Sequence, residues 1–381
     1  MAIILFDNQF RKKLYPLTIT KAVADLRIGI ITIKERWEIK TNQAVFVSTE
    51  KYLQSLYPKF EEEDNIWIDA SVLPNDELLD RILSLEIGDA IADEVGLIAG
   101  RNIKSNSTLL SSYENIFDGI VVRRIEYTWQ MFQWNDEMIR SDFALLTHNK
   151  QSQRISQTNQ IVYQNDIFIE EGATVEYGIL NSSTGPIYIG KHAEVSEGSI
   201  IRGPFALGEH SLVKMGAKIY GATSIGPWCA VGGEIKNVII SGYSNKGHDG
   251  YLGDSVIGEW CNLGACTSNS NVKNSAADIK MWNAFDEKFY SVGIKCGVIM
   301  GDYSRTAINS SINTGSFIGA ACSIFGNGLL PKIINNFTWG LNEKYDFDKA
   351  IRDINNWKKM KHQEISNAEI EVLKSIYELT V

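Results

Sequence analysis

Aliphatic residues recur at every sixth position through the middle of the chain. From residue 189 the rungs of this ladder are Ile189, Val195, Ile201, Leu207, Val213, Ile219, Ile225 and Val231. The same spacing begins earlier at Ile169 and Val175, and it returns at Ile257 and Leu263 and then from Ile294 to Ile324. A period of six fits neither an α-helix nor an alternating strand, and it is typical of hexapeptide-repeat β-helices. The ladder therefore predicts a left-handed parallel β-helix over residues 165–332.

The residue four positions beyond a rung is usually small, as at Ala173 and Ser211. In a triangular coil one large aliphatic side chain fills each flat side, and the neighbouring corner leaves room only for a small side chain. Cys229, Cys261 and Cys322 stand at such positions. We therefore predict that these three thiols fill corners of the core rather than react.

Two stretches interrupt the ladder, one between Val231 and Ile257 and the other between Leu263 and Ile294. A stacked coil accepts insertions only as loops, and such loops often form the binding face of a β-helix. The first stretch carries His248 among glycines and charged residues. An imidazole is suited to accept a proton from an attacking amine at neutral pH, so His248 is a candidate general base. An ordinary surface histidine is the alternative interpretation.

The rest of the chain divides into three segments. Residues 1–150 are expected to form a mixed α/β domain, residues 151–164 a polar linker, and residues 333–381 a helical extension of two short helices that cap or flank the β-helix. A solvated amphipathic tail is the alternative for the last segment. Within the first domain we predict strands at Ala2–Phe6, Ala44–Val47 and Ile66–Ile68, and helices at Asn75–Leu85 and Tyr127–Ile139.

Composition and net charge limit the kinds of molecule that the protein is expected to bind and where it is expected to be found. The 381 residues are 44% hydrophobic and 22% charged, as expected of a globular protein with more than one domain. A formal net charge of −9 argues against a general nucleic-acid binder. No apolar run is long enough to span a bilayer, and the first residues are typical of a strand rather than a secretory leader. Five cysteines without zinc-type spacing favour reduced thiols, and so a cytoplasmic location.

One stretch of about 40 residues carries a more specific signal than the repeat. It contains Glu234-Ile235-Lys236, then Lys246-Gly247-His248-Asp249-Gly250-Tyr251-Leu252-Gly253-Asp254, and then Asn262-Leu263-Gly264-Ala265-Cys266-Thr267 followed by Asn271. Order and spacing resemble the acetyltransferase domain of the bifunctional N-acetylglucosamine-1-phosphate uridylyltransferase / glucosamine-1-phosphate acetyltransferase family. That family carries a K-[AG]-H-x-x-Y-L-G-D segment, followed by N-x-G-A-G-T. The present chain departs from it at Cys266, where the family has glycine.

This resemblance implies roles for four residues of the stretch. His248 would be the general base that removes a proton from the attacking amine. Lys236 and Tyr251 would contact the sugar phosphate, and Asn271 would help to hold the sugar. The implied reaction is transfer of acetyl from acetyl-CoA to a hexosamine 1-phosphate such as glucosamine 1-phosphate.

The resemblance also implies where acetyl-CoA binds. Ala320 and the backbone near Asp302 would line an acetyl-CoA groove along the later coils. In the family this groove lies between neighbouring subunits, so the resemblance implies a homotrimer.

The N-terminal segment resembles the start of a sugar nucleotidyltransferase domain. Arg11 and Pro16-Leu17-Thr18 fit that start, whereas Asp7-Asn8 stands where the family has a glycine-rich phosphate loop. Together with Ala24-Asp25-Leu26-Arg27, the pattern is similar to an alternative bacterial version of the bifunctional enzyme, often labelled a glucose-1-phosphate nucleotidyltransferase. The resemblance implies that Arg11 and Arg27 bind phosphate; surface or interdomain salt bridges are the alternative for both.

If active, this domain would transfer a nucleotidyl group from UTP or dTTP to a sugar 1-phosphate with the help of Mg²⁺. The sequence leaves the metal ligands open, with Asp89 as a guess.

The sequence is also compatible with two functions other than that of a bifunctional enzyme. In the first, the chain is only a sugar-1-phosphate nucleotidyltransferase, similar to glucose-1-phosphate thymidylyltransferases, and its β-helix serves to oligomerise. In the second, it is a non-catalytic scaffold or a binding module for sugar nucleotides. The missing glycines in the N-terminal loop favour the second alternative for that half of the chain.

Overall fold

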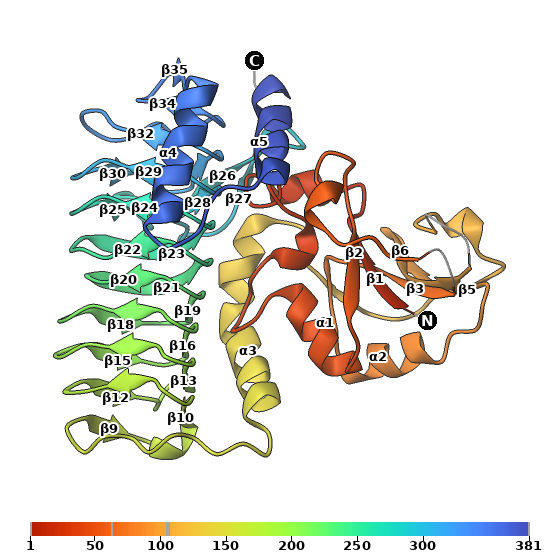
Figure 1. The fold of residues 1–381 in the computed structure, drawn as a ribbon, viewed down its shortest axis with the longest axis horizontal. Helices are drawn as coiled ribbons and strands as arrows, with labels where there is room; N and C mark the ends of the chain where they lie inside the picture. Colours follow the sequence, from red (N-terminus) through yellow and green to blue (C-terminus); the bar gives the residue numbers. More distant parts are fainter. Residues whose placement is uncertain (1, 62–63, 104–106, 380–381) are drawn as a thin grey trace.

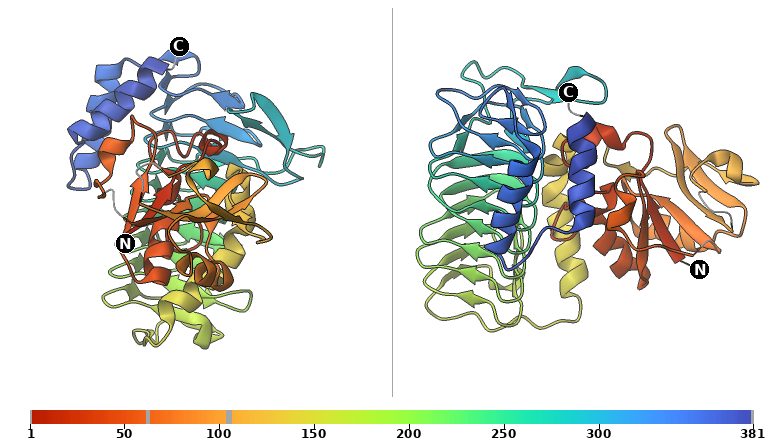
Figure 2. Two further views of the ribbon diagram at one scale, coloured as in Figure 1. Left: turned by 90° about the vertical axis from the view of Figure 1, so that its right-hand side faces the viewer. Right: turned by 45° about the horizontal axis from the view of Figure 1, so that its top comes forward.

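The computed structural model describes residues 2–61, 64–103 and 107–379. An N-terminal α/β domain lies beside a tall parallel β-helix, and the long helix α3 (Thr128–Thr147) stands between the two (Figure 1). The C-terminal helices pack near the last coils, on the side that faces the N-terminal domain (Figure 2). The predicted fold class, an α/β domain followed by a left-handed β-helix and short helices, is confirmed.

The N-terminal domain is built on a mixed six-stranded sheet in the order β2-β1-β3-β6-β5-β7. Its strands are β1 (Ala2–Phe6), β2 (Val45–Ser48), β3 (Asn65–Asp69), β5 (Asp89–Asp93), β6 (Gly96–Asn102) and β7 (Asn115–Phe117), and a separate short ladder joins β4 (Val72–Leu73) to β8 (Arg123–Arg124). The three predicted strands are therefore confirmed as β1, β2 and β3. These three run parallel, so their carboxyl ends meet at one edge of the sheet, the usual place for a ligand in an α/β domain.

Side-chain caps define where the helices of this domain begin. Helix α1 (Ile33–Thr41) starts at Thr32, whose hydroxyl accepts from the Glu35 N–H while the Glu35 carboxylate accepts from the Thr32 N–H. Helix α2 (Asp76–Leu83) starts at Asn75, whose side-chain oxygen accepts from the Leu78 N–H. Helix α3 runs eight residues beyond the predicted end at Ile139, because its continuation buries Asp142 against the first domain.

The β-helix has three flat sides, each a parallel sheet with one short strand per coil. Side one contains β10 (Ile167–Ile169), β13 (Ile187–Ile189), β16 (Phe205–Leu207), β19 (Thr223–Ile225), the second halves of β21 (Glu234–Ile240) and β23 (Tyr251–Ile257), β28 (Val298–Met300), β31 (Ser316–Ile318) and β33 (Ile333–Ile334). Side two contains β11 (Thr174–Val175), β14 (Glu194–Val195), β17 (Leu212–Val213), β20 (Ala230–Val231), β22 (Asn245–Lys246), β24 (Asn262–Leu263), β29 (Arg305–Thr306), β32 (Ser323–Ile324) and β34 (Thr338–Trp339), to which β35 (Glu343–Lys344) adds an antiparallel edge. Side three contains β9 (Gln160–Val162), β12 (Ile179–Asn181), β15 (Ile200–Arg202), β18 (Lys218–Tyr220) and the first halves of β21 and β23, and it continues into the pair β25 (Ser268–Asn269) and β30 (Ser311–Ile312).

The rungs of the sequence ladder point into the coil and form its core. Cys229, Cys261 and Cys322 are buried among them, as predicted. The prediction that residues between Val231 and Ile257 form an inserted loop is wrong, because they continue the β-helix as β21, β22 and β23. The period of six fails there because the rungs follow one another at steps of four and five as well as six.

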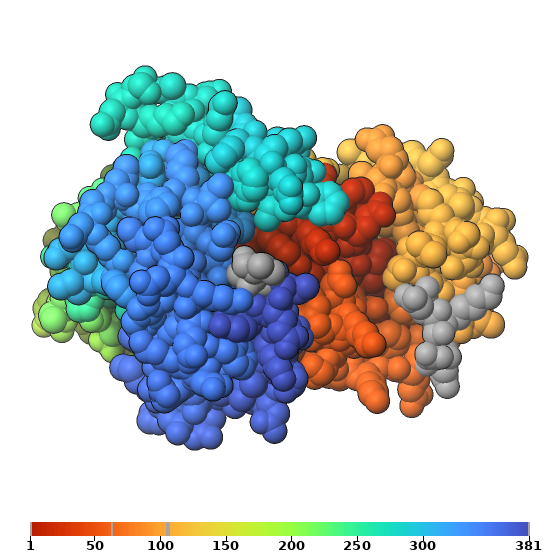
Figure 3. Space-filling model, turned by 90° about the horizontal axis from the view of Figure 1, so that it is seen from above, coloured from red at the N-terminus to blue at the C-terminus, as the bar shows by residue number. Residues whose placement is uncertain are grey.

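The second interruption is a true excursion from the coil. Its residues form a hairpin of β26 (Lys280–Asn283) and β27 (Lys288–Ser291), and Ile294, predicted to be a rung, is 53% exposed. The hairpin reaches across to the N-terminal domain (Figure 3). There Asn283 donates to the Lys13 carbonyl oxygen over 3.0 Å, and the Phe285 ring meets the Phe10 ring edge-on.

Helix α3 joins the N-terminal domain to side one of the β-helix. The buried Asn135 side chain is the clearest link, because its amide donates to the Ala222 carbonyl oxygen and its oxygen accepts from the Gly29 N–H and the Ser224 hydroxyl. Apolar residues of the outer surface of side one, such as Ile239 and Val256, share one core with the N-terminal sheet. Among the described residues, no helix combines the length and the apolar character needed to cross a bilayer.

The C-terminal residues form α4 (Phe347–Lys359) and α5 (Asn367–Leu379), so the two predicted helices are confirmed. Their apolar faces pack with Trp260, Tyr303 and Ala320 of the β-helix and with Leu53 of the N-terminal domain. The extension is therefore part of the folded core and is not a solvated tail.

Candidate functional site

His248 lies on a corner of the β-helix that projects beyond the corner below it. The chain takes six positions from Lys246 to Leu252 to turn from side two to side three, against four from Val231 to Ile235 in the coil beneath. His248 is exposed on this longer corner. Gly233 supports it from below: its φ is +71°, and a Cβ there would stand 2.7 Å from the His248 carbonyl oxygen, so only glycine fits.

Two of the predicted substrate-binding residues meet at the next corner, where side three turns into side one. The Asn271 amide donates to the Tyr251 hydroxyl over 3.0 Å and also bonds the Asp254 carboxylate. Asp254 is buried and accepts a second bond from Asn237 over 2.7 Å. Asp254 and Asn237 were not predicted as site residues, although Asp254 belongs to the Tyr251-Leu252-Gly253-Asp254 segment that carries the resemblance.

Lys236 lies at the same corner, one coil below Gly253. Its ammonium stands 6.0 Å from the centre of the Tyr220 ring, and the Tyr220 hydroxyl donates to Glu234 over 2.6 Å. That bond raises the pKa of Tyr220 to about 12, and burial raises the pKa of Tyr251 above its ordinary value. Both phenols therefore stay protonated at neutral pH and act as hydrogen-bonding groups rather than as bases.

A second lysine approaches the histidine corner from the coils below. The Lys214 side chain lies against Gly247, with its ammonium 3.4 Å from where a Cβ of that residue would stand. Lysine charge thus lies near both edges of side three, with Lys214 at the His248 corner and Lys236 at the opposite corner. The sequence offered no spacing rule that would single out Lys214, because its place depends on how coils of unequal length stack.

The predicted acetyl-CoA residues lie elsewhere and are covered by the same chain. Ala320 is completely buried beside the C-terminal helices. The Asp302 carboxylate accepts from the Thr20 hydroxyl and the Glu259 N–H and pairs with Lys21 at 3.1 Å, so it fastens the N-terminal domain to the β-helix. Asp302 also lines a cavity of about 300 Å³ together with Lys21 and Glu259. The roles of Asp302 and Ala320 in acetyl-CoA binding stay predictions.

The two arginines predicted to bind phosphate are largely engaged within the fold. The buried Arg11 pairs with Asp7 at 2.9 Å and donates to the carbonyl oxygens of Thr18 and Lys21. Arg27 donates to the Ile30 carbonyl oxygen and lies 3.8 Å from the Glu35 carboxylate. Both arginines thus make ion pairs within the first domain, and the Arg11 pair is buried rather than at the surface. Their roles in phosphate binding stay predictions.

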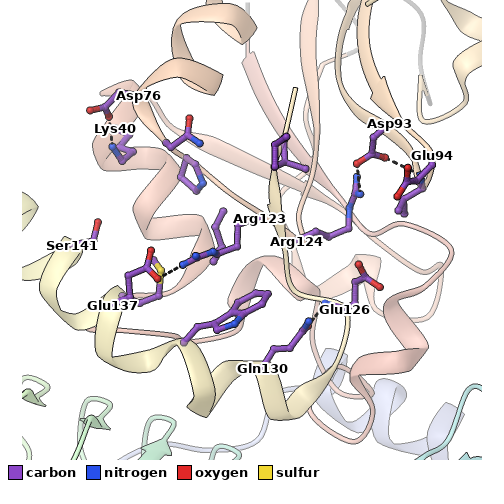
Figure 4. A pocket seen from close by; sticks show the side chains of 18 residues that line it. Lys40, Asp76, Asp93, Glu94, Arg123, Arg124, Glu126, Gln130, Glu137 and Ser141 are labelled. Atoms are coloured by element: carbon purple, nitrogen blue, oxygen red, sulfur yellow. Dashed lines mark hydrogen bonds and ion pairs between the residues drawn. The ribbon is translucent and has the colours of Figure 1, made fainter. Parts of the chain in front are cut away.

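A third arginine, not singled out by the sequence, has free hydrogen-bonding capacity. Arg124 is only 7% exposed; its Nε donates to Asp69 over 3.0 Å and its Nη1 to Asp93 over 2.7 Å (Figure 4). Its buried Nη2 has no partner among the described residues. Unsatisfied buried donors are uncommon, and they often mark a place that a water or a ligand occupies.

Three neighbouring cavities lie near the carboxyl ends of β1 and β3, and Arg124 lines two of them. The central cavity, of about 170 Å³, is lined by Arg11, Lys13 and Arg124 together with Asn8. It shares Arg124 with a large cavity of about 800 Å³ that extends along α3 (Figure 4), and Asn8 with a sheet-edge cavity of about 360 Å³. The cations therefore gather where the smallest cavity joins the two larger ones.

The described residues contain no cluster of three or more His, Cys, Asp or Glu side chains placed to hold a metal ion. Asp89, the guess from sequence, bonds Asn115 and the Glu86 N–H at the start of β5. A preformed cage for Mg²⁺ is thus not among these residues. Magnesium is commonly bound by one or two carboxylates together with substrate phosphates, so a magnesium site in this domain would include phosphate oxygens of the nucleotide.

Comparison with known proteins supports the relationship that the motifs predict. Residues 3–151 match the family described as sugar nucleotidyl transferase. Two proteins called bifunctional protein GlmU are similar: that of Methanocaldococcus jannaschii is 36% identical over 106 residues, covering 28% of this chain and 26% of the relative, and that of Methanococcus aeolicus is 40% identical over 97 residues, covering 24% and 23%. The bifunctional sugar-1-phosphate nucleotidylyltransferase/acetyltransferase of Sulfurisphaera tokodaii is 33% identical over 99 residues, covering 26% and 24%.

The chain thus spans about a quarter of the length of the curated relatives it matches. The match at residues 3–151 agrees with the α/β sheet described above, and the β-helix agrees with the acetyltransferase part of the relatives' name. Residues 3–151 are therefore similar to sugar nucleotidyl transferase domains, and the chain is similar over about a quarter of its length to proteins named as bifunctional nucleotidylyltransferase/acetyltransferases or as GlmU.

Proposed function

We propose that the β-helix transfers an acetyl group from acetyl-CoA to the amino group of a hexosamine 1-phosphate, with glucosamine 1-phosphate as the first candidate. The observation that supports this proposal most is the grouping of Lys236, Tyr251 and Asn271 at one edge of side three, with the His248 corner at the other edge, where β23 begins. A cation, two neutral hydrogen-bonding groups and an imidazole are the groups that such a substrate needs.

In the proposed reaction the amine nitrogen attacks the thioester carbonyl carbon, and a nitrogen–carbon bond replaces the carbon–sulfur bond. His248 accepts the proton that the nitrogen loses and passes it to the departing sulfur, so that coenzyme A leaves as a thiol. Lys236 places positive charge beside the sugar phosphate. Tyr251 contacts the same phosphate, Asn271 helps to hold the sugar, and the acetyl-CoA thioester lies at the His248 corner.

The direct test is release of coenzyme A thiol from acetyl-CoA by the full chain. We expect release that depends on glucosamine 1-phosphate and yields an N-acetylated sugar phosphate, which mass spectrometry would identify. Absence of thiol release with every amino-sugar phosphate supplied would reject acetyl transfer. It would also favour a β-helix that serves only to oligomerise.

We further propose that the N-terminal domain joins a nucleoside triphosphate, UTP or dTTP, to a sugar 1-phosphate. A phosphate oxygen of the sugar phosphate attacks the α-phosphorus, and the bond to the β-phosphate breaks, so that pyrophosphate leaves. The arrangement of cavities supports this proposal. A nucleotide sugar has its phosphates in the middle, and here a small cavity with Arg11, Lys13 and Arg124 stands between two larger ones.

Arg124→Lys tests this site, because lysine keeps a cation beside Asp69 and Asp93 but loses the free Nη2 donor. We expect the Kd for UTP with Mg²⁺ to rise more than tenfold, measured by calorimetry, and pyrophosphate release to fall in parallel. Acetyl transfer should stay unchanged. Arg81→Lys on the exposed surface of α2 is the matched control. Unaltered UTP affinity in Arg124→Lys would remove Arg124 from the site, and absence of UTP binding by the unmodified chain would favour a non-catalytic N-terminal half.

The homotrimer implied by resemblance belongs to the same proposal. Helix α3 covers side one, and residues of α4 approach side two, where Trp357 lies beside Arg305. Outward-facing residues of side three such as Ile200 and Lys218 are exposed, so this side is open to a neighbouring copy.

A further inference from the structure

Lys246 occupies an inward position of the β-helix where a lysine is not expected. It pairs with Val231 of the coil below, and Leu263 follows one coil above on the same side; both neighbours are buried core residues. Lys246 is 1% exposed and is among the largest fully buried side chains of the protein. Burying an ammonium group is costly unless it finds good hydrogen-bond partners, so a valine or leucine would suit the core better.

The partners of this ammonium group are two backbone carbonyls at the histidine corner. Nζ donates to the Gly232 carbonyl oxygen over 3.0 Å and to the His248 carbonyl oxygen over 2.5 Å. Gly232 belongs to the short corner below, and His248 to the longer corner that projects beyond it. The lysine therefore bridges two corners of unequal length from inside the coil.

The backbone of the longer corner has few other ties. Within the part of the chain that the structure describes, no backbone N–H of residues 247–250 donates to a backbone carbonyl. The first end of the corner is closed by the Gly232 N–H, which donates to the Lys246 carbonyl oxygen. The second end is closed by the Glu234 N–H, which donates to the Gly250 carbonyl oxygen, and by the Tyr251 N–H, which donates to the Ser268 hydroxyl. Between these ends, the Lys246 ammonium donates a hydrogen bond to the backbone of His248 itself.

We propose that Lys246 is a positioning residue, whose buried ammonium group ties the His248 carbonyl to the coil below and thereby fixes the imidazole at the edge of side three. This inference rests on the proposed role of His248 as the base of acetyl transfer. Burial lowers the pKa of Lys246 to about 8. An amine keeps N–H donors in both of its protonation states, so the tie persists through neutral and mildly alkaline pH.

Lys246→Met tests the proposal, because methionine fills the core with an unbranched chain but donates no hydrogen bond. We expect kcat for acetyl transfer to fall more than tenfold while KM for acetyl-CoA changes by less than about twofold, since the imidazole is displaced and binding groups are not. The midpoint of thermal unfolding should not fall, because the change removes a buried charge. Leu263→Met, one coil above on the same side, is the matched control and should keep kcat.

Amide hydrogen exchange gives a second readout that does not depend on catalysis. In Lys246→Met the amides of Glu234 and Tyr251, which close the second end of the corner, should exchange more than tenfold faster, whereas the Leu212 amide, two coils below Lys246 on side two, should not change. If the unmodified chain shows no acetyl transfer, the proposed function fails, and exchange alone decides the role of Lys246. Unchanged kcat together with unchanged exchange would overturn the proposal. Should Lys246→Met not fold, Lys246→Gln, whose amide reaches one carbonyl at most, is judged by the same two readouts.

Discussion

Replacing His248 by asparagine is expected to lower kcat for acetyl transfer by about 10²- to 10⁴-fold, the range that a general base commonly contributes. Asparagine keeps a polar side chain of similar reach but does not take up a proton at neutral pH. His248 is exposed on its corner and has no part in the β-helix core, so the substitution should leave the fold intact. Initial rates of coenzyme A thiol release, with KM values for both substrates, measure the effect.

His210→Asn is the control for this experiment. His210 is exposed on a different corner, where its ring stacks between those of His192 and Trp228 at 5.1 and 4.3 Å. We expect kcat in this variant to stay within about twofold of the unmodified chain. Equal losses in both variants would point to a general effect of losing a histidine, and unchanged kcat in His248→Asn would remove His248 from the chemistry.

The repeat made the β-helix predictable because each coil needs large aliphatic side chains at fixed steps. The step changes between Val231 and Ile257, where one turn from side two to side three takes four positions and the turns from side three to side one take five. A rule based on six then gives a false insertion. The same change of step creates the projecting corner that carries His248. The place where the periodic signal failed is therefore the place where the coil departs from regularity to present a side chain.

Contacts between segments that are distant in the sequence could not be predicted from the pattern of residues. Asp302 and Ala320 stand at ordinary coil positions, and only the folded chain shows that Lys21 and the C-terminal helices cover them. Arg124 has no local motif either, because its partners Asp69 and Asp93 come from two other strands of the first domain. By contrast, the motif named both Tyr251 and Asn271 as substrate-binding candidates, and the structure brings them into direct contact.

Replacing Asp142 by alanine is expected to destabilise the protein by about 3–5 kcal/mol, because it leaves a buried guanidinium without its counter-charge. The Asp142 carboxylate, 0% exposed, accepts from Arg36 Nε over 2.9 Å, from Arg36 Nη2 over 2.7 Å and from the Ile30 N–H over 2.8 Å. The pair ties α3 to α1 and to the loop before it, so its loss should loosen the N-terminal domain. Urea unfolding can be followed by tryptophan fluorescence, because Trp37 is buried in this region and directly follows Arg36 in the sequence.

A matched pair on the same helix separates this effect from an ordinary loss of charge. Arg140 and Asp136 of α3 form an ion pair at 2.6 Å that is about half exposed, so Asp136→Ala should cost about 1 kcal/mol or less. The double variant Arg36→Met/Asp142→Leu removes both buried charges and should recover most of the stability lost in Asp142→Ala, because two apolar side chains need no counter-charge. A double variant less stable than Asp142→Ala would instead show that the hydrogen bond to Ile30 and the packing around it matter more than the charge pair.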